Sequence, residues 1–192
     1  MRYFESDEEL KELNIVKENI ILNTQNAPKR STTLDAEIYS ITVHGEKFVI
    51  VIGLQNGFPY EIFGGHMNGF GIKNKKTKGK ITKISSGKYA LEFGDIIIED
   101  FSMQFTPVEQ LLFRSTSLML RHGIPIQFIV EQLQRATDDI SSLASASSRV
   151  LKKYIENGQK VSGKSCPSCN GKSLLYFDGC VKCSTCTWEA CS

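Results

Sequence analysis

Cysteine is absent from the first 165 residues of this 192-residue chain, and no apolar run approaches the length that crosses a membrane. The acidic first dozen residues do not resemble a signal peptide, which is basic before its apolar stretch. These absences exclude a disulfide framework spread through the chain and a membrane-spanning protein. They predict a cytoplasmic protein whose clustered cysteines bind metal in a reducing compartment.

The net charge is also small, and the sequence shows no recognisable catalytic motif. The net charge of +2 is too small to favour nucleic acid as a partner through global electrostatics. The sequence has no recognisable hydrolase triad order, phosphate-binding loop or pair of catalytic carboxylates. His122 follows Arg121 at the expected end of a helix, where we interpret it as a capping or hydrogen-bonding residue. The thiols are therefore the one chemistry that the sequence displays.

All six cysteines lie in the last 27 residues, in C-x2-C spacings that are typical of zinc ribbons. Four thiolates complete a tetrahedral structural zinc site. The preferred ligands are Cys166, Cys169, Cys183 and Cys186. This set is favoured because Gly179 and the short strand that follows it have the form that leads into a second zinc knuckle. The competing set is Cys166, Cys169, Cys180 and Cys183.

Two thiols remain outside the metal site on either assignment. They are Cys180 and Cys191 with the preferred ligands, and Cys186 and Cys191 with the competing ones. Cys191 stands next to the last residue, where the chain is least tethered, so this pair can exchange with a disulfide elsewhere. The alternatives are that the spare cysteines are inert, since free cysteine packs as a small apolar residue, or that all six share metal. We predict a redox pair at Cys180 and Cys191.

The hydrophobic pattern changes from period two to a helical period along the chain. Alternating and short apolar segments, such as 47–54, run from residue 29 to about residue 101 and predict strands. Helix-start signals follow at Thr106, Pro125 and Ser142. Strands followed by helices predict an α+β fold, an antiparallel sheet packed on a layer of about three helices and followed by a small zinc ribbon.

Three parts are expected. Residues 1–28 form an N-terminal docking arm that opens with a capping box, Ser6 and Glu9. Residues 29–160 form the accessory α+β domain, and residues 161–192 form the zinc ribbon with its redox cysteine tail.

A lysine-rich passage lies within the predicted sheet. Its members are Lys73, Lys75, Lys76, Lys78, Lys80, Lys83 and Lys88. A finger that contacts nucleic-acid phosphates is one interpretation. A solvated hairpin built from strands 80–84 and 89–93 is favoured, because no aromatic residues alternate with the lysines for base stacking.

Four segments in the same order resemble the C-terminal region of adenosylcobalamin-dependent, class II ribonucleotide reductases. The segments are Lys29-Arg30 with 34–63, then 121–134, 149–155 and the terminal cysteine module 166–191. The resemblance covers about residues 29 to 192. It implies the accessory domain and cysteine tail of such a reductase without the longer catalytic barrel, which in that family carries the nucleotide site and the cobalamin contacts.

The resemblance also implies partners and a role. In that family each turnover oxidises two active-site cysteines, and a flexible C-terminal dithiol re-reduces them before a thioredoxin-like reductant resets it. We therefore expect structural zinc on this chain, adenosylcobalamin on a partner catalytic barrel chain, and no complete active site here. Because the chain begins with its own arm, we expect a separately encoded component of a split ribonucleoside-diphosphate reductase. The alternative is a zinc-ribbon module that binds nucleic acid or only stabilises assembly.

Overall fold

The computed structural model describes residues 27–66, 72, 75–101, 105–161 and 163–191. Residues 1–26 of the predicted arm, with its capping box, lie outside the described residues. The main sheet contains β1 (Thr33–Val43), β2 (Glu46–Gln55), β3 (Phe58–His66), β4 (Lys76–Ser85), β5 (Lys88–Phe93) and β6 (Ile96–Ile98). The helices are α2 (Pro107–Arg121), α3 (Ile126–Arg135) and α4 (Leu143–Lys152). The C-terminal sheet contains β7 (Leu174–Phe177), β8 (Cys180–Cys183) and β9 (Glu189–Ala190), which completes the predicted α+β fold.

The main sheet is antiparallel throughout, with the strand order β3-β2-β1-β4-β5-β6. The tight turns between its strands contain residues that accept a positive φ. Asn56 and Gly57 have φ of 54° and 84°, as the predicted Asn-Gly hairpin between β2 and β3 requires. The lysine-rich passage forms the predicted hairpin, in which Lys83 of β4 pairs with Tyr89 of β5.

The sheet curls until strands that are distant in its order meet. The rings of Phe63 on β3 and Tyr89 on β5 are 4.9 Å apart, although three strands separate β3 from β5. In a flat sheet these strands would be about 19 Å apart, because neighbouring strands are spaced by about 4.8 Å. The curl encloses a second core, in which Phe101 and Phe105 pack against the concave face. The strands β2 and β3 are therefore buried on both faces.

Two glycines of β3 permit the close approach of aromatic side chains. A Cβ atom on Gly64 would lie 2.6 Å from Phe113 Cζ of α2, and one on Gly65 would collide with the ring of Phe105. Both glycines lie within a strand, where packing, and not backbone conformation, excludes a side chain.

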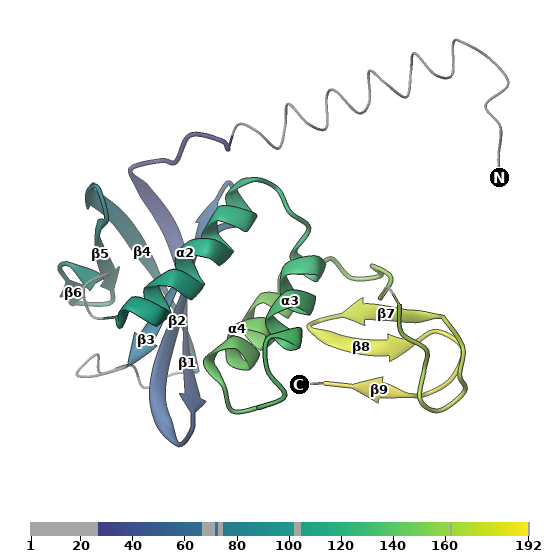
Figure 1. Ribbon diagram of the computed structural model, residues 1–192. Coiled ribbons are helices and arrows are strands. Elements are labelled where there is room, and N and C mark those ends of the chain that lie inside the picture. The colour runs from purple at the N-terminus through teal and green to yellow at the C-terminus, as the bar shows by residue number, and fades with distance from the viewer. Residues whose placement is uncertain (1–26, 67–71, 73–74, 102–104, 162, 192) are drawn as a thin grey trace, which may run out of the picture.

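The helices form a layer between the two sheets. α2 crosses one face of the main sheet, and α3 and α4 lie between that sheet and the small C-terminal one (Figure 1). Ser117 of α2 fixes the crossing, because its hydroxyl accepts a hydrogen bond from the Ile62 N–H at 2.9 Å and donates to the Ile62 carbonyl at 3.1 Å. Within the described residues, none of the helices is both long enough and apolar enough to span a membrane.

The start of α2 has the predicted capping box. The Thr106 hydroxyl oxygen accepts from the Glu109 N–H, and the Glu109 carboxylate accepts from the Thr106 N–H at 2.7 Å. α4 begins after the predicted N-cap Ser142 and ends at Lys152. After Lys152 the backbone tightens into i→i−3 bonds, and the hydroxyl of Tyr154 reaches both Glu37 and Tyr39 of β1.

The substitution Thr106→Ala is expected to lower the free energy of unfolding by about 1 kcal/mol, because the Glu109 N–H at the start of α2 loses its side-chain acceptor. Denaturant unfolding followed by far-ultraviolet circular dichroism measures the change. The matched control is Thr187→Ala, at an exposed loop threonine, which should stay within about 0.5 kcal/mol of the parent. An equal loss in both variants would contradict the capping role.

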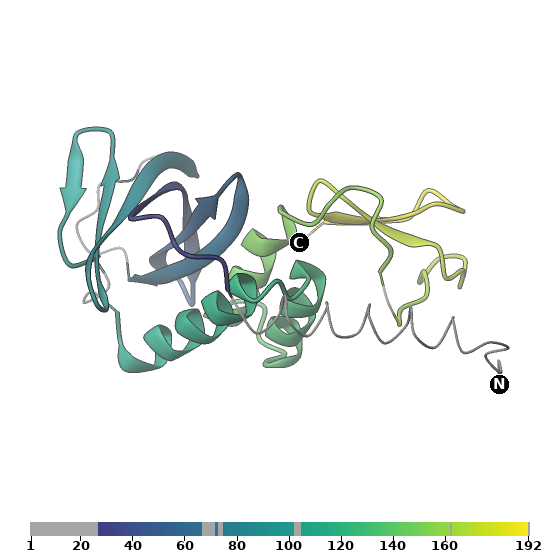
Figure 2. The same ribbon diagram turned by 90° about the horizontal axis from the view of Figure 1, so that it is seen from above.

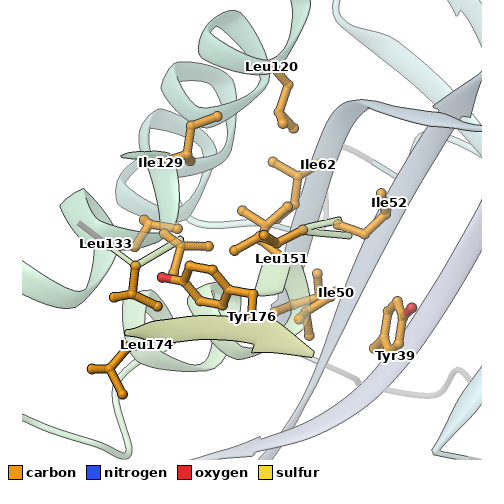
Figure 3. Packing of buried hydrophobic residues seen from close by; sticks show 14 of the residues in the cluster. Tyr39, Ile50, Ile52, Ile62, Leu120, Ile129, Leu133, Leu151, Leu174 and Tyr176 are labelled. Carbon is orange, nitrogen blue, oxygen red and sulfur yellow. The ribbon is translucent and has the colours of Figure 1, made fainter. Parts of the chain in front are cut away.

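The C-terminal module packs on the helical layer and does not hang from a linker. Val161, the first residue of the module, is buried and donates its N–H to the Leu174 carbonyl at 2.9 Å. Figure 3 shows Tyr176 of β7 beside Leu133 of α3 and Leu151 of α4, and all of them belong to one buried cluster. The view from above shows the same succession of main sheet, helices and small sheet (Figure 2).

Candidate metal centre and cysteine pair

Four cysteine sulfurs converge at one end of the C-terminal module. Cys166 Sγ lies 3.6 Å from Cys186 Sγ, and Cys169 Sγ lies 3.7 Å from Cys183 Sγ. All four sulfurs lie within 4.8 Å of one another. A tetrahedron whose corners are each about 2.3 Å from a central zinc has edges of about 3.8 Å. The four sulfurs therefore have the spacing that a tetrahedral metal ion requires.

Local backbone geometry brings the sulfurs together. In the first knuckle the Asn170 N–H donates to the Cys166 carbonyl at 2.8 Å, and Asn170 adopts a left-handed φ of 56°. Asparagine tolerates this conformation better than most residues, so the absence of glycine here is accommodated. In the second knuckle the Thr185 N–H points at Cys183 Sγ, at 3.4 Å.

The pKa values of Cys169 and Cys183 are shifted in opposite directions. The Thr185 N–H lowers the pKa of Cys183 to about 6. The Gly171 N–H also lowers the pKa of Cys169, but the neighbouring sulfurs of Cys183 and Cys186 outweigh it and raise that pKa to about 12. Negative charge on one sulfur thus opposes ionisation of its neighbour. A divalent cation at the centre would remove this conflict, so the cluster could hold a metal ion.

The remaining two cysteines form a disulfide. Cys180 begins β8 and Cys191 follows β9, with their Cα atoms 4.3 Å apart. Cys191 is exposed and Cys180 is half-buried. Because Cys180 and Cys183 occupy opposite ends of β8, the disulfide and the metal cluster are separated by about 10 Å along the strand.

The end of the chain is more ordered than we expected. Cys191 was predicted to lie in a loosely tethered tail, but β9 pairs with β8 through Val181 with Ala190 and through Lys182 with Glu189. Lys182 Nζ also lies 3.3 Å from a carboxylate oxygen of Glu189. A two-residue strand gives almost no periodic signal in a sequence, which is why this pairing was not anticipated.

The structure brings together the four cysteines preferred as metal ligands and sets the predicted redox pair apart from them. In the competing assignment Cys180 would bind metal, but here its sulfur is bonded to Cys191. A carboxylate of Glu189 lies near this pair, 3.4 Å from Cys191 Sγ. His122 is the C-cap residue of α2, where its N–H bonds to helix carbonyls.

The sequence did not predict a buried ionic cluster that the structure shows in the main domain. The Glu61 side chain on β3 is fully buried between two arginines, with Arg30 Nε donating to it at 3.0 Å and Arg121 Nη2 at 2.8 Å. A Cβ atom on Gly53 would lie 2.8 Å from Glu61 Cγ, so the neighbouring strand leaves room for this carboxylate. The only available signal was a glutamate at an inward position of an apolar strand.

The fold and the cysteines together define a class of protein: an α+β domain that carries a C-terminal, cysteine-rich module able to hold a metal ion. Comparison with known families matches residues 34–156 to the family described as NrdJ homologue C-terminal domain. The chain belongs to this family, which supports the predicted likeness to the C-terminal region of a class II ribonucleotide reductase. Neither the curated proteins nor the solved structures contain a match.

Proposed function

We propose that this chain is the accessory, non-barrel component of a class II ribonucleotide reductase and that Cys180 and Cys191 relay electrons to the catalytic chain. The observation that carries the proposal is a disulfide outside the metal cluster, in a chain of the NrdJ-related family. The catalytic barrel chain would bind the adenosylcobalamin and carry the substrate cysteines. This chain would supply the thiols.

Exposure of the disulfide supports thiol exchange. Exchange requires a thiolate to approach a disulfide sulfur along the sulfur–sulfur axis, so at least one sulfur must be reachable. Cys191 is exposed, whereas Cys180 is half-buried and held in β8. An incoming thiolate would therefore attack Cys191 Sγ, and the Cys180 thiolate would leave.

The relay is balanced in electrons. A reduced dithiol protein attacks Cys191 Sγ and releases Cys180 as a thiolate, and its second thiolate then displaces Cys191. The two reduced cysteines next meet the disulfide of the catalytic chain. The Cys191 thiolate attacks it, and Cys180 resolves the mixed disulfide, which restores the Cys180–Cys191 bond. Two electrons pass from the dithiol protein to the catalytic cysteines in each cycle.

Zinc is the metal that we propose for the four-cysteine cluster. Four thiolates in a tetrahedral arrangement are typical of structural zinc sites, which keep no open position for a substrate. Zinc has no redox chemistry, so it would hold the module folded while the separate disulfide cycles. The division between four structural and two redox cysteines follows from this assignment. The reducing partner and the relay both belong to a reducing compartment such as the cytoplasm.

The variant Cys191→Ser is expected to abolish multiple-turnover nucleotide reduction when the chain is mixed with its catalytic barrel chain, thioredoxin and thioredoxin reductase. The first turnover of a pre-reduced catalytic chain should be unchanged, because the relay acts only after the active-site disulfide forms. The measurement is deoxynucleotide formed per catalytic chain, before and after the first turnover.

The neighbouring substitution Thr187→Ser removes no sulfur and should behave as the parent. Cys180→Ser should lose turnover like Cys191→Ser, because either serine leaves only one thiol of the pair. Full multiple-turnover activity in both cysteine variants would show that the chain serves assembly and not electron relay. A failure to bind the catalytic chain at all would refute the accessory role itself.

A further inference from the structure

A cavity of about 510 Å³ opens between α2, β3 and the turn of the β4–β5 hairpin. Its described lining residues all fall between Ile62 and Arg121, so the cysteine module contributes none of them. Small-molecule sites in proteins have volumes of about 300 to 1,000 Å³ and combine apolar walls with a few placed polar groups. This cavity has the size and position of a ligand site that the cysteines do not explain.

Aromatic rings form much of the wall. They belong to Phe63, Tyr89, Phe105 and Phe113. The rings of Phe63 and Tyr89 lie 4.9 Å apart and are held by the curl of the sheet. The guanidinium of Arg30 lies 5.4 Å from the centre of the Tyr89 ring. Such a wall favours a planar, apolar group of a ligand.

The cavity also carries an excess of positive charge. Its described lining includes Lys83, Arg114 and Arg121 and no carboxylate. Lys83 and Arg114 are exposed, and neither forms an ion pair with another described residue. Lys83 belongs to β4 of the hairpin and Arg114 belongs to α2, so the two cations reach the cavity from different elements. Lys83 and Arg114 lie beside Arg121, whose charge is partly offset by Glu61, and together these side chains favour an anion at the cavity.

Arg121 presents a partly exposed guanidinium at the cavity, with a side chain that is 29% exposed. Its Nη2 atom donates to Glu61 at 2.8 Å. Glu61 also fixes the guanidinium in place, and a fixed guanidinium loses little freedom when it binds.

We propose that this cavity binds a small molecule in which a phosphate group is joined to a planar ring, the chemistry of a nucleoside phosphate. The phosphate meets Arg114, Arg121 and Lys83, and the ring packs against the aromatic wall beside Tyr89. The proposal does not depend on the electron relay, because the cavity and the disulfide share no described lining residue. Bound ligand would place a charged group on the α2 face of the domain.

Isothermal titration calorimetry of the full chain tests this inference with four probes: ATP, AMP, adenosine and inorganic phosphate. We expect ATP and AMP to bind. Adenosine has the ring without a phosphate, and inorganic phosphate has no ring, so each should bind at least about tenfold more weakly. Affinity for ATP should fall as sodium chloride is raised, because exposed cations are screened.

The variants Arg114→Gln and Lys83→Gln are each expected to weaken ATP binding by about tenfold or more. Both side chains are exposed, so the fold should be unchanged, and circular dichroism checks this. The matched control is Lys88→Gln, on the same hairpin, whose amine faces Asp100 at 3.8 Å and does not line the cavity. It should bind ATP as the parent does.

Three results would overturn the proposal. The first is the absence of measurable ATP and AMP binding at millimolar concentration. The second is ATP affinity that Arg114→Gln and Lys83→Gln leave unchanged, or that Lys88→Gln lowers equally, because charge in general would then be responsible. The third is inorganic phosphate that binds as tightly as ATP, which would leave the ring without a role.

Discussion

Replacement of Glu61 by alanine is expected to lower the free energy of unfolding of the main domain by about 3 to 5 kcal/mol. The carboxylate is fully buried, and the side chains of Arg30 and Arg121 that face it are only 10% and 29% exposed. Removal of the one anion leaves two buried cations facing each other. The loss corresponds to a fall in melting temperature on the order of 10 °C.

Two further variants separate charge from volume. Glu61→Gln keeps the space beside Gly53 filled but removes the charge, so it should destabilise the domain nearly as much as alanine does. Glu46→Ala removes an exposed carboxylate that lies 3.3 Å from His66 in the same sheet, and its effect should be within about 1 kcal/mol of zero. Denaturant unfolding followed by circular dichroism measures all three. Full stability of Glu61→Gln would show that packing, and not charge, explains the alanine effect.

The second large effect is expected at the metal cluster. Cys166→Ser should abolish zinc binding and unfold the C-terminal module, because the binding free energy of a structural zinc is folding free energy for the segment that holds it. That binding free energy is about 10 to 16 kcal/mol in zinc-finger peptides at neutral pH. Cys166 is also buried in the core cluster that joins this module to the helices.

Zinc content by mass spectrometry and the fluorescence of Trp188 measure this effect. Trp188 is the single tryptophan of the chain and lies in the C-terminal module beside Tyr176 and Val181, so its emission reports the state of this module. Circular dichroism of the main domain should change little. Zinc retained at one ion per chain in Cys166→Ser would contradict the assignment.

Two more serine variants distinguish the possible ligand sets. If zinc binds at Cys166, Cys169, Cys183 and Cys186, then Cys186→Ser should lose zinc and Cys180→Ser should keep it. The competing set requires the reverse result. Both measurements are made under reducing conditions, so that the Cys180–Cys191 disulfide does not decide the outcome.

Local signals predicted much of the fold. The Asn-Gly turn at residues 56 and 57, the capping box at Thr106 and the N-cap at Ser142 all act within a few residues, so the sequence displays them directly. The end of α4 has no such local signal, because the residues after it are held by Tyr154, whose hydroxyl bonds to Glu37 and Tyr39 of β1, more than a hundred residues away. A contact between residues so far apart in the chain produces no periodic pattern in the sequence near the end of the helix.

The sequence by itself determined the α+β order of strands and helices, because side-chain periodicity is a property of neighbouring residues, and it determined that six clustered thiols exceed the needs of one tetrahedral ion. Only the tertiary structure decided which sulfurs meet, how far the sheet curls, and that Glu61 lies between two arginines. The physical reason is that these features depend on which distant segments pack together, and packing is settled by the shape and burial of the whole chain.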